Sequence, residues 1–221
     1  MPAHLQKEIE HLKKRILNLG DKVEAAVRDA AIAIEQRNGG LASQIIKNDV
    51  EIDQQEVEVE EECLKTLALH QPVANDLRFI IAVLKINNDL ERIGDLAVNI
   101  AQRAIFLAEQ PKLDISFDFS GMAAVAKSML KKSIDALVNL DIELAQQVRI
   151  SDDTIDNMNR QMYLKVQKAI LDNPGQIASL IQLLSVSRHL ERIADHATNI
   201  AEDVIYMVEG RIVRHKTNNP V

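Results

Sequence analysis

The sequence predicts an all-α protein made of two tandem, similar three-helix bundles, with six long antiparallel helices in all. The low content of glycine and proline, 7 and 5 of 221 residues, is typical of long helices rather than strands. Two twelve-residue segments, 90–101 and 190–201, are identical at nine positions and lie 100 residues apart. Such a repeat indicates one structural unit present twice. Apolar residues make up 47% of the chain and aromatic residues 3%, so we expect aliphatic cores between closely packed helices.

Three helices are expected in the first half, which we place at residues 1–110. The Asn-Gly-Gly sequence at 38–40 ends the first helix, because glycine readily adopts the left-handed conformation of a helix cap. Pro72 breaks the second helix, and Asn75 or Asp76 caps the third. The expected helices cover residues 3–37, 41–70 and 76–109.

The second half, residues 117–210, repeats this plan after a boundary at 110–116. The Asp-Asn-Pro-Gly sequence at 172–175 predicts a turn between its second and third helices. Gly210 ends the last helix, and residues 211–221 form a polar tail. The expected helices cover 117–139, 141–171 and a final stretch that ends at 209. Connections this short make neighbouring helices antiparallel.

The overall charge disfavours several classes of partner. A net charge of −7 opposes non-specific nucleic-acid binding and adsorption to anionic lipid, which both need cationic surfaces. The sequence has no apolar run long enough to span a bilayer, and residues 1–15 do not resemble a signal peptide. Cys63 is the one cysteine, which fits a reducing compartment, and we expect it to be buried. We therefore expect a cytoplasmic protein that neither binds nucleic acid nor inserts into a membrane.

The repeated segment predicts a helix with two different faces. Its apolar residues alternate at spacings of four and three, as in a bundle helix, and therefore belong to the core. These residues are Ile86, Leu90, Ile93, Ala97 and Ile100. At about 100° per residue, Glu91, Asp95 and Asn99 fall on the opposite side of the helix. The second copy carries the same outward polar row at Glu191, Asp195 and Asn199.

A pair of aspartates precedes each copy of the repeated segment. Asp49 and Asp53 are four residues apart, and Asp152 and Asp156 repeat them 103 residues later. Residues four apart share a helix face, and two carboxylates at this spacing repel each other unless a cation lies between them. Each half therefore combines two acidic pairs from antiparallel neighbouring helices, which predicts a cluster of four carboxylates with an asparagine beside it.

Clustered carboxylate oxygens favour hard cations, so we interpret both clusters as metal sites. Iron, Mn²⁺, Mg²⁺, Ca²⁺ and Zn²⁺ are the candidate ions, and the sequence leaves the identity and the number of ions open. The alternative is a solvated acidic face without metal, because single Asp-x-x-x-Asp pairs are common on surface helices. Repetition of both pairs together with the asparagine favours the metal sites.

Other polar motifs are weaker candidates. His189 and His196 share a helix face to one side of the acidic row, and we interpret them as packing or interface residues. The Glu-Ile-Glu-His sequence at 8–11 lacks the second copy that a di-iron bundle needs. The sequence shows no glycine-rich phosphate loop, no Ser-His-Asp pattern and no zinc-site spacing, so we do not expect an enzyme.

The combination of motifs resembles the PhoU family of phosphate-transport regulatory proteins over essentially the full chain. The most diagnostic stretch is Gln-Pro-Val-Ala-Asn-Asp-Leu-Arg at 71–78, followed by Leu-Glu-Arg-Ile-Gly-Asp at 90–95. The second half repeats the latter as Leu-Glu-Arg-Ile-Ala-Asp at 190–195.

The resemblance implies a cytoplasmic, non-enzymatic regulator that forms a homodimer. Such a protein would restrain the phosphate ABC transporter through its ATPase subunit and damp a membrane sensor histidine kinase when phosphate is plentiful. The resemblance also implies metal binding on the bundle surface. The ligands would be Asp49, Asp53, Glu91, Asp95 and Asn99 in the first half and Asp152, Asp156, Glu191, Asp195 and Asn199 in the second.

The two halves differ in the segment that follows their second helices. Asp76 and Arg78 have no counterpart in the second half, where Gln-Ile-Ala stands at 176–178. We therefore interpret Asp76 and Arg78 as contacts to a partner that only the first half makes. A milder difference is Ala194 in place of Gly94.

Two other functions fit parts of the sequence. A carboxylate-bridged di-iron oxidase would use the same residue types, but it needs a second Glu-x-x-His and a shielded pocket. A purely structural helical scaffold would use the acidic rows only for solubility. If metal binds, it either turns the acidic face into one that attracts anions or acidic partner residues, or it only joins the helices.

Overall fold

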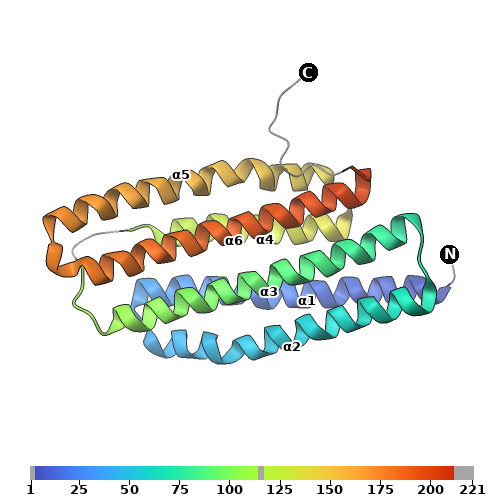
Figure 1. Cartoon of the computed structure of the whole chain (residues 1–221), viewed down its shortest axis with the longest axis horizontal. Helices are drawn as coiled ribbons and strands as arrows, with labels where there is room; N and C mark the ends of the chain where they lie inside the picture. Colours follow the sequence, from blue (N-terminus) through green and yellow to red (C-terminus); the bar gives the residue numbers. More distant parts are fainter. Residues whose placement is uncertain (1–2, 114–116, 212–221) are drawn as a thin grey trace, which may run out of the picture.

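The computed structural model describes residues 3–113 and 117–211, and this part of the chain is almost entirely helical (Figure 1). Its six long α-helices confirm the predicted fold class, and no strand occurs among the described residues. The first half consists of α1 (Ala3–Gln36), α2 (Gly39–His70) and α3 (Ala74–Ala108). The second half consists of α4 (Phe119–Asn139), α5 (Ile142–Asp172) and α6 (Ile177–Glu209), with a 3-10 turn at Pro174–Gln176 before α6.

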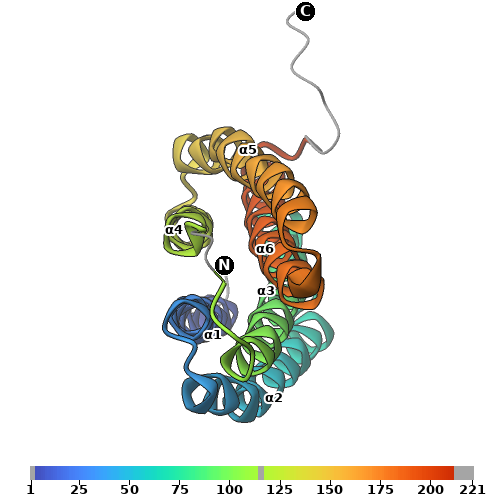
Figure 2. The same ribbon diagram turned by 90° about the vertical axis from the view of Figure 1, so that its left-hand side faces the viewer.

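Each half is a three-helix unit, and the two units lie side by side along their length (Figures 1 and 2). Within a unit every helix contacts the other two, and between the units α3 packs against α6 and α1 against α4. Helices α3 and α6 run in opposite directions (Figure 1). The buried apolar side chains of both units therefore form one continuous core.

The two copies of the repeated segment lie where the units meet, on α3 and α6. Leu90, Ile93, Ala97 and Ile100 are fully buried on α3, and their counterparts 100 residues later are fully buried on α6. Full burial of a Leu or Ile side chain contributes about 1.5–3 kcal/mol to folding. The predicted apolar face is confirmed, and it stabilises both units at once.

The junction between α1 and α2 differs from the prediction. Gly39 and Gly40 do not terminate α1 but open α2, whose N-cap is Asn38. The Asn38 side chain accepts a hydrogen bond from the Leu41 N–H at 3.0 Å, which satisfies one of the four N–H groups that a helix start leaves unpaired. The left-handed residue between the helices is Arg37, with φ of 52°.

The start of α3 also corrects the prediction. Neither Asn75 nor Asp76 is the cap, because the helix already begins at Ala74. Val73 precedes it in an extended conformation and offers no side-chain acceptor. The Asn75 carboxamide oxygen instead accepts a hydrogen bond from the guanidinium group of Arg78, within the first turn.

Aspartate caps open the first two helices of the second half. Helix α4 begins two residues later than predicted, because Asp118 is its N-cap and accepts a hydrogen bond from the Gly121 N–H at 2.8 Å. Asp141 caps α5 and accepts from the Leu144 N–H at 2.9 Å. Gly210 ends α6 in the left-handed conformation, with φ of 68°, as predicted.

Two predicted segments fall partly outside the described residues. The boundary between the halves includes residues 114–116, and the polar tail continues past residue 211. Cys63 is fully buried, as expected, and burial raises the pKa of its thiol to about 12. None of the described helices combines the length and the hydropathy needed to cross a membrane.

The Asp141 cap provides a test of this helix-end geometry. Asp141→Ala leaves the Leu144 N–H without its acceptor, so we expect the free energy of unfolding to fall by about 1 kcal/mol. For a chain of this size the Tm should fall by about 2–4 °C in a thermal circular-dichroism scan. Asp141→Asn keeps a side-chain oxygen and should retain most of the stability. Equal losses in the two variants would contradict the capping role.

Candidate metal centres and the seam between the halves

The acidic pairs of the first half lie beside each other on α2 and α3. Asp49 is half-buried against the backbone of α3: a Cβ placed on Gly94 would come within 3.4 Å of the Asp49 Oδ1 atom and 3.2 Å of the Ile52 Cγ2 atom. The two helices therefore approach each other closely at Gly94. Asp53 and Asp95 are exposed at the outer edge of this contact, so the group spans a half-buried floor and an open rim.

Burial and mutual repulsion raise the pKa values in this first cluster. The pKa of Asp49 is raised to about 6, first by burial and then by the charges of Asp53 and Asp95. Burial also raises the pKa of Glu91, with Asp95 as its strongest charged neighbour. Glu56 and Asp53 add to this effect. The four predicted carboxylates therefore share one electrostatic environment, as the sequence predicts.

The second half repeats this environment between α5 and α6. The pKa of Asp152 is raised to about 6 by burial and by the charge of Asp195, although the Thr198 hydroxyl donates a hydrogen bond to its Oδ1 atom at 3.2 Å. Burial and the charge of Asp156 raise the pKa of Asp195. Burial and the charge of Asp195 raise that of Glu191.

Glu56 is a member of the first cluster that the sequence analysis missed. It follows Asp49 by seven residues and Asp53 by three, so it shares their helix face, and this spacing was the available signal. Its carbonyl oxygen and Oε1 atom accept hydrogen bonds from Asn87 Nδ2 at 2.8 and 3.1 Å. These bonds fix the register of α2 on α3 next to the carboxylates.

The second half keeps the same register with different side chains. Asn159 stands 103 residues after Glu56, and its Oδ1 atom accepts a hydrogen bond from the Ser187 hydroxyl at 2.7 Å. Thr198 has Val98 as its counterpart, so the first cluster lacks that hydroxyl donor. The two clusters are therefore similar in position but not in composition, because Asn159 replaces Glu56 while Asp153 adds a charge beside Asp152.

The two motif asparagines are half-buried beside the clusters. Arg103 Nη1 donates to the Asn99 carbonyl oxygen at 3.0 Å and approaches the Asn99 Oδ1 atom at 3.5 Å. Asn199 lies at the matching place on α6. In this arrangement the Arg103 guanidinium lies beside the amide oxygen of Asn99. The sequence analysis did not predict this contact.

A metal ion would need the carboxylates to move closer together than they lie here. Among the described residues, no three Asp, Glu, His or Cys side chains form a group that could hold a metal ion. The donor chemistry does fit a hard cation, because each cluster offers carboxylate oxygens whose pKa values are raised by burial and repulsion. Coordination therefore requires rotamer changes of the exposed carboxylates toward the half-buried ones.

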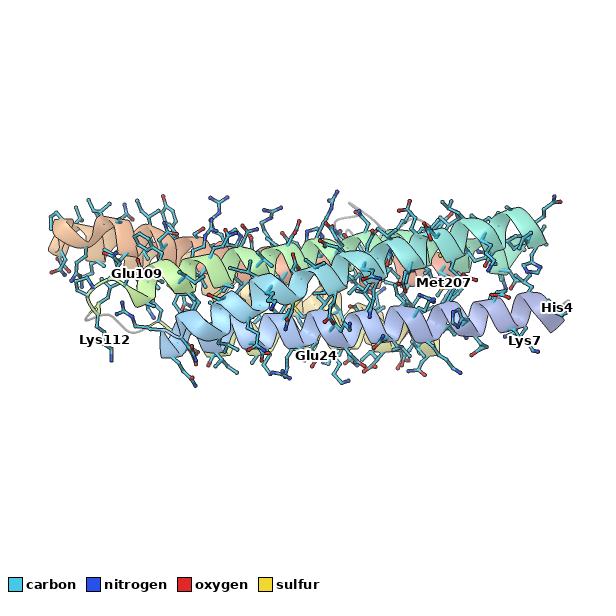
Figure 3. All side chains as sticks on the ribbon, turned by 90° about the horizontal axis from the view of Figure 1, so that it is seen from below. His4, Lys7, Glu24, Glu109, Lys112 and Met207 are labelled. Atoms are coloured by element: carbon cyan, nitrogen blue, oxygen red, sulfur yellow. The ribbon has the colours of Figure 1, made fainter. Side chains whose placement is uncertain are left out.

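The predicted partner contacts lie where the start of α3 meets the end of α6. Arg78 is half-buried, and its Nη1 atom would be 2.7 Å from a Cβ on Gly210. A cation beside the C-terminus of a helix interacts favourably with the helix dipole, so Arg78 also stabilises the free protein. Asp76 is half-buried and lines a cavity of about 260 Å³ together with Met207. In Figure 3, Met207 lies toward the end that carries His4, away from Glu109 and Lys112.

Two polar pairs connect α3 to α6 across the seam between the halves. His196 Nδ1 and Asp89 Oδ1 are 2.8 Å apart, and both residues are buried. Lys85 Nζ lies 3.2 Å from the Oδ1 atom of Asp203, which is 2% exposed. His196 is buried between α3 and α6, which agrees with the prediction that it is a packing or interface residue. His189 lies half-buried seven residues earlier on α6.

Comparison with known proteins fits this architecture. A family model described as the PhoU domain matches the chain twice, at residues 16–104 and 119–204. The chain belongs to the PhoU family. The resemblance seen in the repeated motifs is thereby confirmed, and the two PhoU matches coincide with the two three-helix units.

Relatives of the PhoU family match nearly the whole chain. The phosphate-specific transport system accessory protein PhoU homolog of Aquifex aeolicus is 41% identical over 96% of this chain and 96% of its own length. The crystal structure of PhoU from Pseudomonas aeruginosa has a TM-score of 0.90 at 36% identity and covers 93% of this chain and 99% of that one. The crystal structure of the phosphate transport system regulatory protein PhoU from Streptococcus pneumoniae has a TM-score of 0.83 at 28% identity, with coverage of 95% and 99%.

The raised pKa values predict a pH-dependent effect of neutralising Asp49 and Asp152 together. A carboxyl group whose pKa is raised by folding contributes stability that is present below its ordinary pKa, about 4, and is lost as the pH rises through about 6. In metal-free buffer at pH 7, Asp49→Asn/Asp152→Asn should therefore be more stable than the wild type. Relief of like-charge contacts predicts a gain of about 1 kcal/mol, or about 2–4 °C in Tm.

The matched control is Glu61→Gln/Glu143→Gln, which removes two exposed charges from the same helices. It should not reproduce the gain at pH 7. The difference between wild type and Asp49→Asn/Asp152→Asn should shrink toward zero near pH 4, where the aspartates are protonated. A stability difference that does not vary with pH would show that the raised pKa values are not its cause.

Proposed function

We propose that this protein is a cytoplasmic, non-enzymatic regulator of phosphate transport that acts as a homodimer and binds metal ions at its two carboxylate clusters. Its partners are the ATPase subunit of a phosphate ABC transporter and a membrane sensor histidine kinase. It restrains uptake and damps the phosphate-starvation response when phosphate is plentiful. Membership of the PhoU family supports the link to phosphate transport, since the named relatives are accessory proteins of the phosphate-specific transport system.

The observation that carries the metal-binding part is the repeated set of half-buried carboxylates with raised pKa values. Asp49 in the first half and Asp152 in the second have pKa values of about 6, so both are mostly ionised at pH 7 and repel their neighbours. A bound cation supplies positive charge and accepts further oxygen ligands. The proposed ligands are Asp49, Asp53, Glu91, Asp95 and Asn99, and in the second half Asp152, Asp156, Glu191, Asp195 and Asn199.

The residues of this chain prepare such a site in three ways. Packing of α2 on α3 at Gly94 holds Asp49 in place, while Asp53 and Asp95 at the rim remain free to change rotamer. The ionised row concentrates negative potential on the outer faces of both units. Asn99 becomes available once Arg103 releases its amide oxygen, and that contact, at 3.5 Å, is long for a hydrogen bond.

The geometry favours a regulator over the di-iron oxidase. The clusters include exposed carboxylates, whereas buried redox chemistry needs a shielded pocket. Hydrolytic chemistry has little support, because Ser185 and His189 lie 3.3 Å apart but no described side chain pairs with the second imidazole nitrogen. A serine nucleophile normally relies on a histidine that a third group orients.

Metal analysis tests the proposal most directly. Wild-type protein purified without chelators should carry metal in stoichiometric amounts, measured by inductively coupled plasma mass spectrometry. The variant with Glu91, Asp95, Glu191 and Asp195 changed to Ala should lose that metal, because each cluster loses its α3 or α6 carboxylates. Reconstitution with iron, Mn²⁺, Mg²⁺, Ca²⁺ and Zn²⁺ should then identify the preferred ion.

The control variant removes four exposed acids away from the clusters, at Asp21, Glu61, Glu143 and Asp172. It should retain its metal, which separates ligation from a general effect of charge. If the wild type takes up no metal in any of these solutions, the clusters are not metal sites but an acidic interaction surface. If metal removal lowers Tm but leaves partner binding intact, the ion only joins the helices. If partner binding is lost with little change in Tm, the ion forms the docking surface.

Arg78→Ala tests the proposed partner contact of the first half. Binding to the isolated ATPase subunit or to the cytoplasmic part of the kinase should weaken by about tenfold, the typical effect of losing an interface arginine. Because Arg78 also lies against Gly210, the variant needs a thermal scan beside the binding assay. Arg78→Lys keeps the charge at the α6 C-terminus and serves as the stability control. Unchanged affinity for both partners in a folded Arg78→Ala protein would refute the contact.

A further inference from the structure

Helices α3 and α6 carry copies of one sequence and pack antiparallel, so each contact across their seam has a related position at the other end. A contact between residue i of α3 and residue j of α6 corresponds to one between j − 100 on α3 and i + 100 on α6. The Lys85–Asp203 pair therefore corresponds to Ser185 and Arg103. A comparison of the two ends shows where the halves have diverged.

The second polar pair of the seam has diverged in the same way. Asp89 and His196, which are 2.8 Å apart, correspond to His189 and Leu96. The end of the seam with Lys85 and His196 thus places a carboxylate beside each of these two basic side chains. The opposite end has the basic side chains Arg103 and His189 at the positions related to the two aspartates. Neither pair at this end therefore contains a carboxylate.

Arg103 is a half-buried cation with neutral hydrogen-bond partners. Its Nη1 atom donates to the Asn99 carbonyl oxygen at 3.0 Å and to Gln102 Oε1 at 3.2 Å. Its Nε atom is buried and has no acceptor among the described residues. An unpaired buried donor is destabilising, and more so when it is charged, so an anionic oxygen at this place would be stabilising.

His189 lies in the same positive environment. Its Nδ1 atom is buried without a described partner, and its Nε2 atom is 3.3 Å from the Ser185 hydroxyl. Arg192 follows His189 by three residues on α6 and therefore lies on the same helix face. The imidazole has at least one N–H to donate in either protonation state, and the charges of Arg103, Arg192 and Arg188 act on it.

The three arginines do not contribute equally. Arg188 and Arg192 are exposed and share their charge with the acidic row, because Arg188 interacts with Glu191 and Arg192 with Asp195. The partners described for Arg103 are all neutral, as given above. The positive potential at this end of the seam is therefore least compensated at Arg103.

We propose that Arg103, His189 and Arg192 form a binding site for a phosphate-type oxyanion at this end of the α3–α6 seam. Guanidinium groups present paired N–H donors that match two oxygens of one tetrahedral anion. The His189 imidazole adds a directional N–H donor, and a half-buried position strengthens each of these interactions relative to water. The site is distinct from the carboxylate clusters, which would attract cations.

Inorganic phosphate is the ligand that we assign, and this choice among oxyanions rests on the proposed function. A phosphoryl group on a partner protein has the same chemistry. The two sources differ in size, because a phosphoryl ester carries its alcohol side chain into the half-buried seam. Inorganic phosphate and O-phosphoserine therefore serve as separate probes.

The test is isothermal titration of metal-free, full-length protein with inorganic phosphate, in EDTA and at constant ionic strength. EDTA removes any metal-bound phosphate from the signal. The wild type should bind one phosphate per chain in a saturable manner. Arg103→Gln should weaken that binding by about tenfold or more, because it removes a charge-assisted hydrogen bond worth about 1.5–3 kcal/mol.

Two controls separate the site from general effects on charge and packing. Lys85→Gln removes the cation at the related end of the seam, where Asp203 accompanies it, and should bind phosphate like the wild type. Arg160→Gln removes an exposed charge from α5 and should also leave the affinity unchanged. If Arg103→Gln does not fold, Arg192→Gln, at an exposed position, is used in its place.

The outcomes decide the proposal independently of partner binding. Phosphate binding that is lost in Arg103→Gln and kept in both controls supports the site, and additional binding of O-phosphoserine shows that a phosphorylated partner can also supply the ligand. No saturable phosphate binding up to about 10 mM, or equal affinities in all variants, would overturn it. The proposed regulatory function is tested separately by the metal and partner-binding assays, because those assays do not use phosphate. Absence of metal and partner binding would refute that function without deciding the phosphate site.

Discussion

The antiparallel packing of α3 against α6 is the constraint on which the rest of the structure depends. Each of these helices buries one apolar stripe, formed by Leu90, Ile93, Ala97 and Ile100 on α3 and by the same residue types on α6. The two helices also contact both other helices of their own units, so the two cores merge into one. Because the apolar stripes must face inward, the polar rows of the same helices are fixed on the outer side, next to α2 and α5. The carboxylate clusters are a consequence of this arrangement.

The clusters persist because the core is large compared with the repulsion that they cause. Two like charges four residues apart cost a few tenths of a kcal/mol, whereas one fully buried leucine or isoleucine contributes about 1.5–3 kcal/mol. The repulsion is concentrated where α2 approaches α3 at Gly94, and a Cβ there would crowd Ile52 at 3.2 Å. In the second half the buried Ala194 takes this place, so α5 and α6 accommodate the additional methyl group.

The repeat preserves backbone positions more strictly than charge. Both α2–α3 and α5–α6 have a side-chain hydrogen bond at the same register, but it joins Asn87 to Glu56 in one half and Ser187 to Asn159 in the other. Along the α3–α6 seam, Asp203 and Asp89 accompany the basic side chains of Lys85 and His196 at one end, whereas no carboxylate stands at the related positions at the other. Two helices that share the repeated segment therefore differ in the charges that they place along their common seam. Duplication of a unit allows this, because a side chain that loses its role in one copy retains it in the other.

The sequence by itself determined the six helices, the two units, the apolar stripes and the faces on which Asp49, Asp53, Glu91 and Asp95 lie. These features follow from local periodicity and from the repeat, so no knowledge of the tertiary contacts is needed. Only the tertiary structure decided which side chains cap the helices, that Glu56 joins the first cluster, and that Arg103 donates a hydrogen bond to Asn99. It also decided that His189 lies among cations while His196 pairs with Asp89. These features depend on the register and the approach of helices far apart in the chain, which the spacing of residues within one helix does not encode.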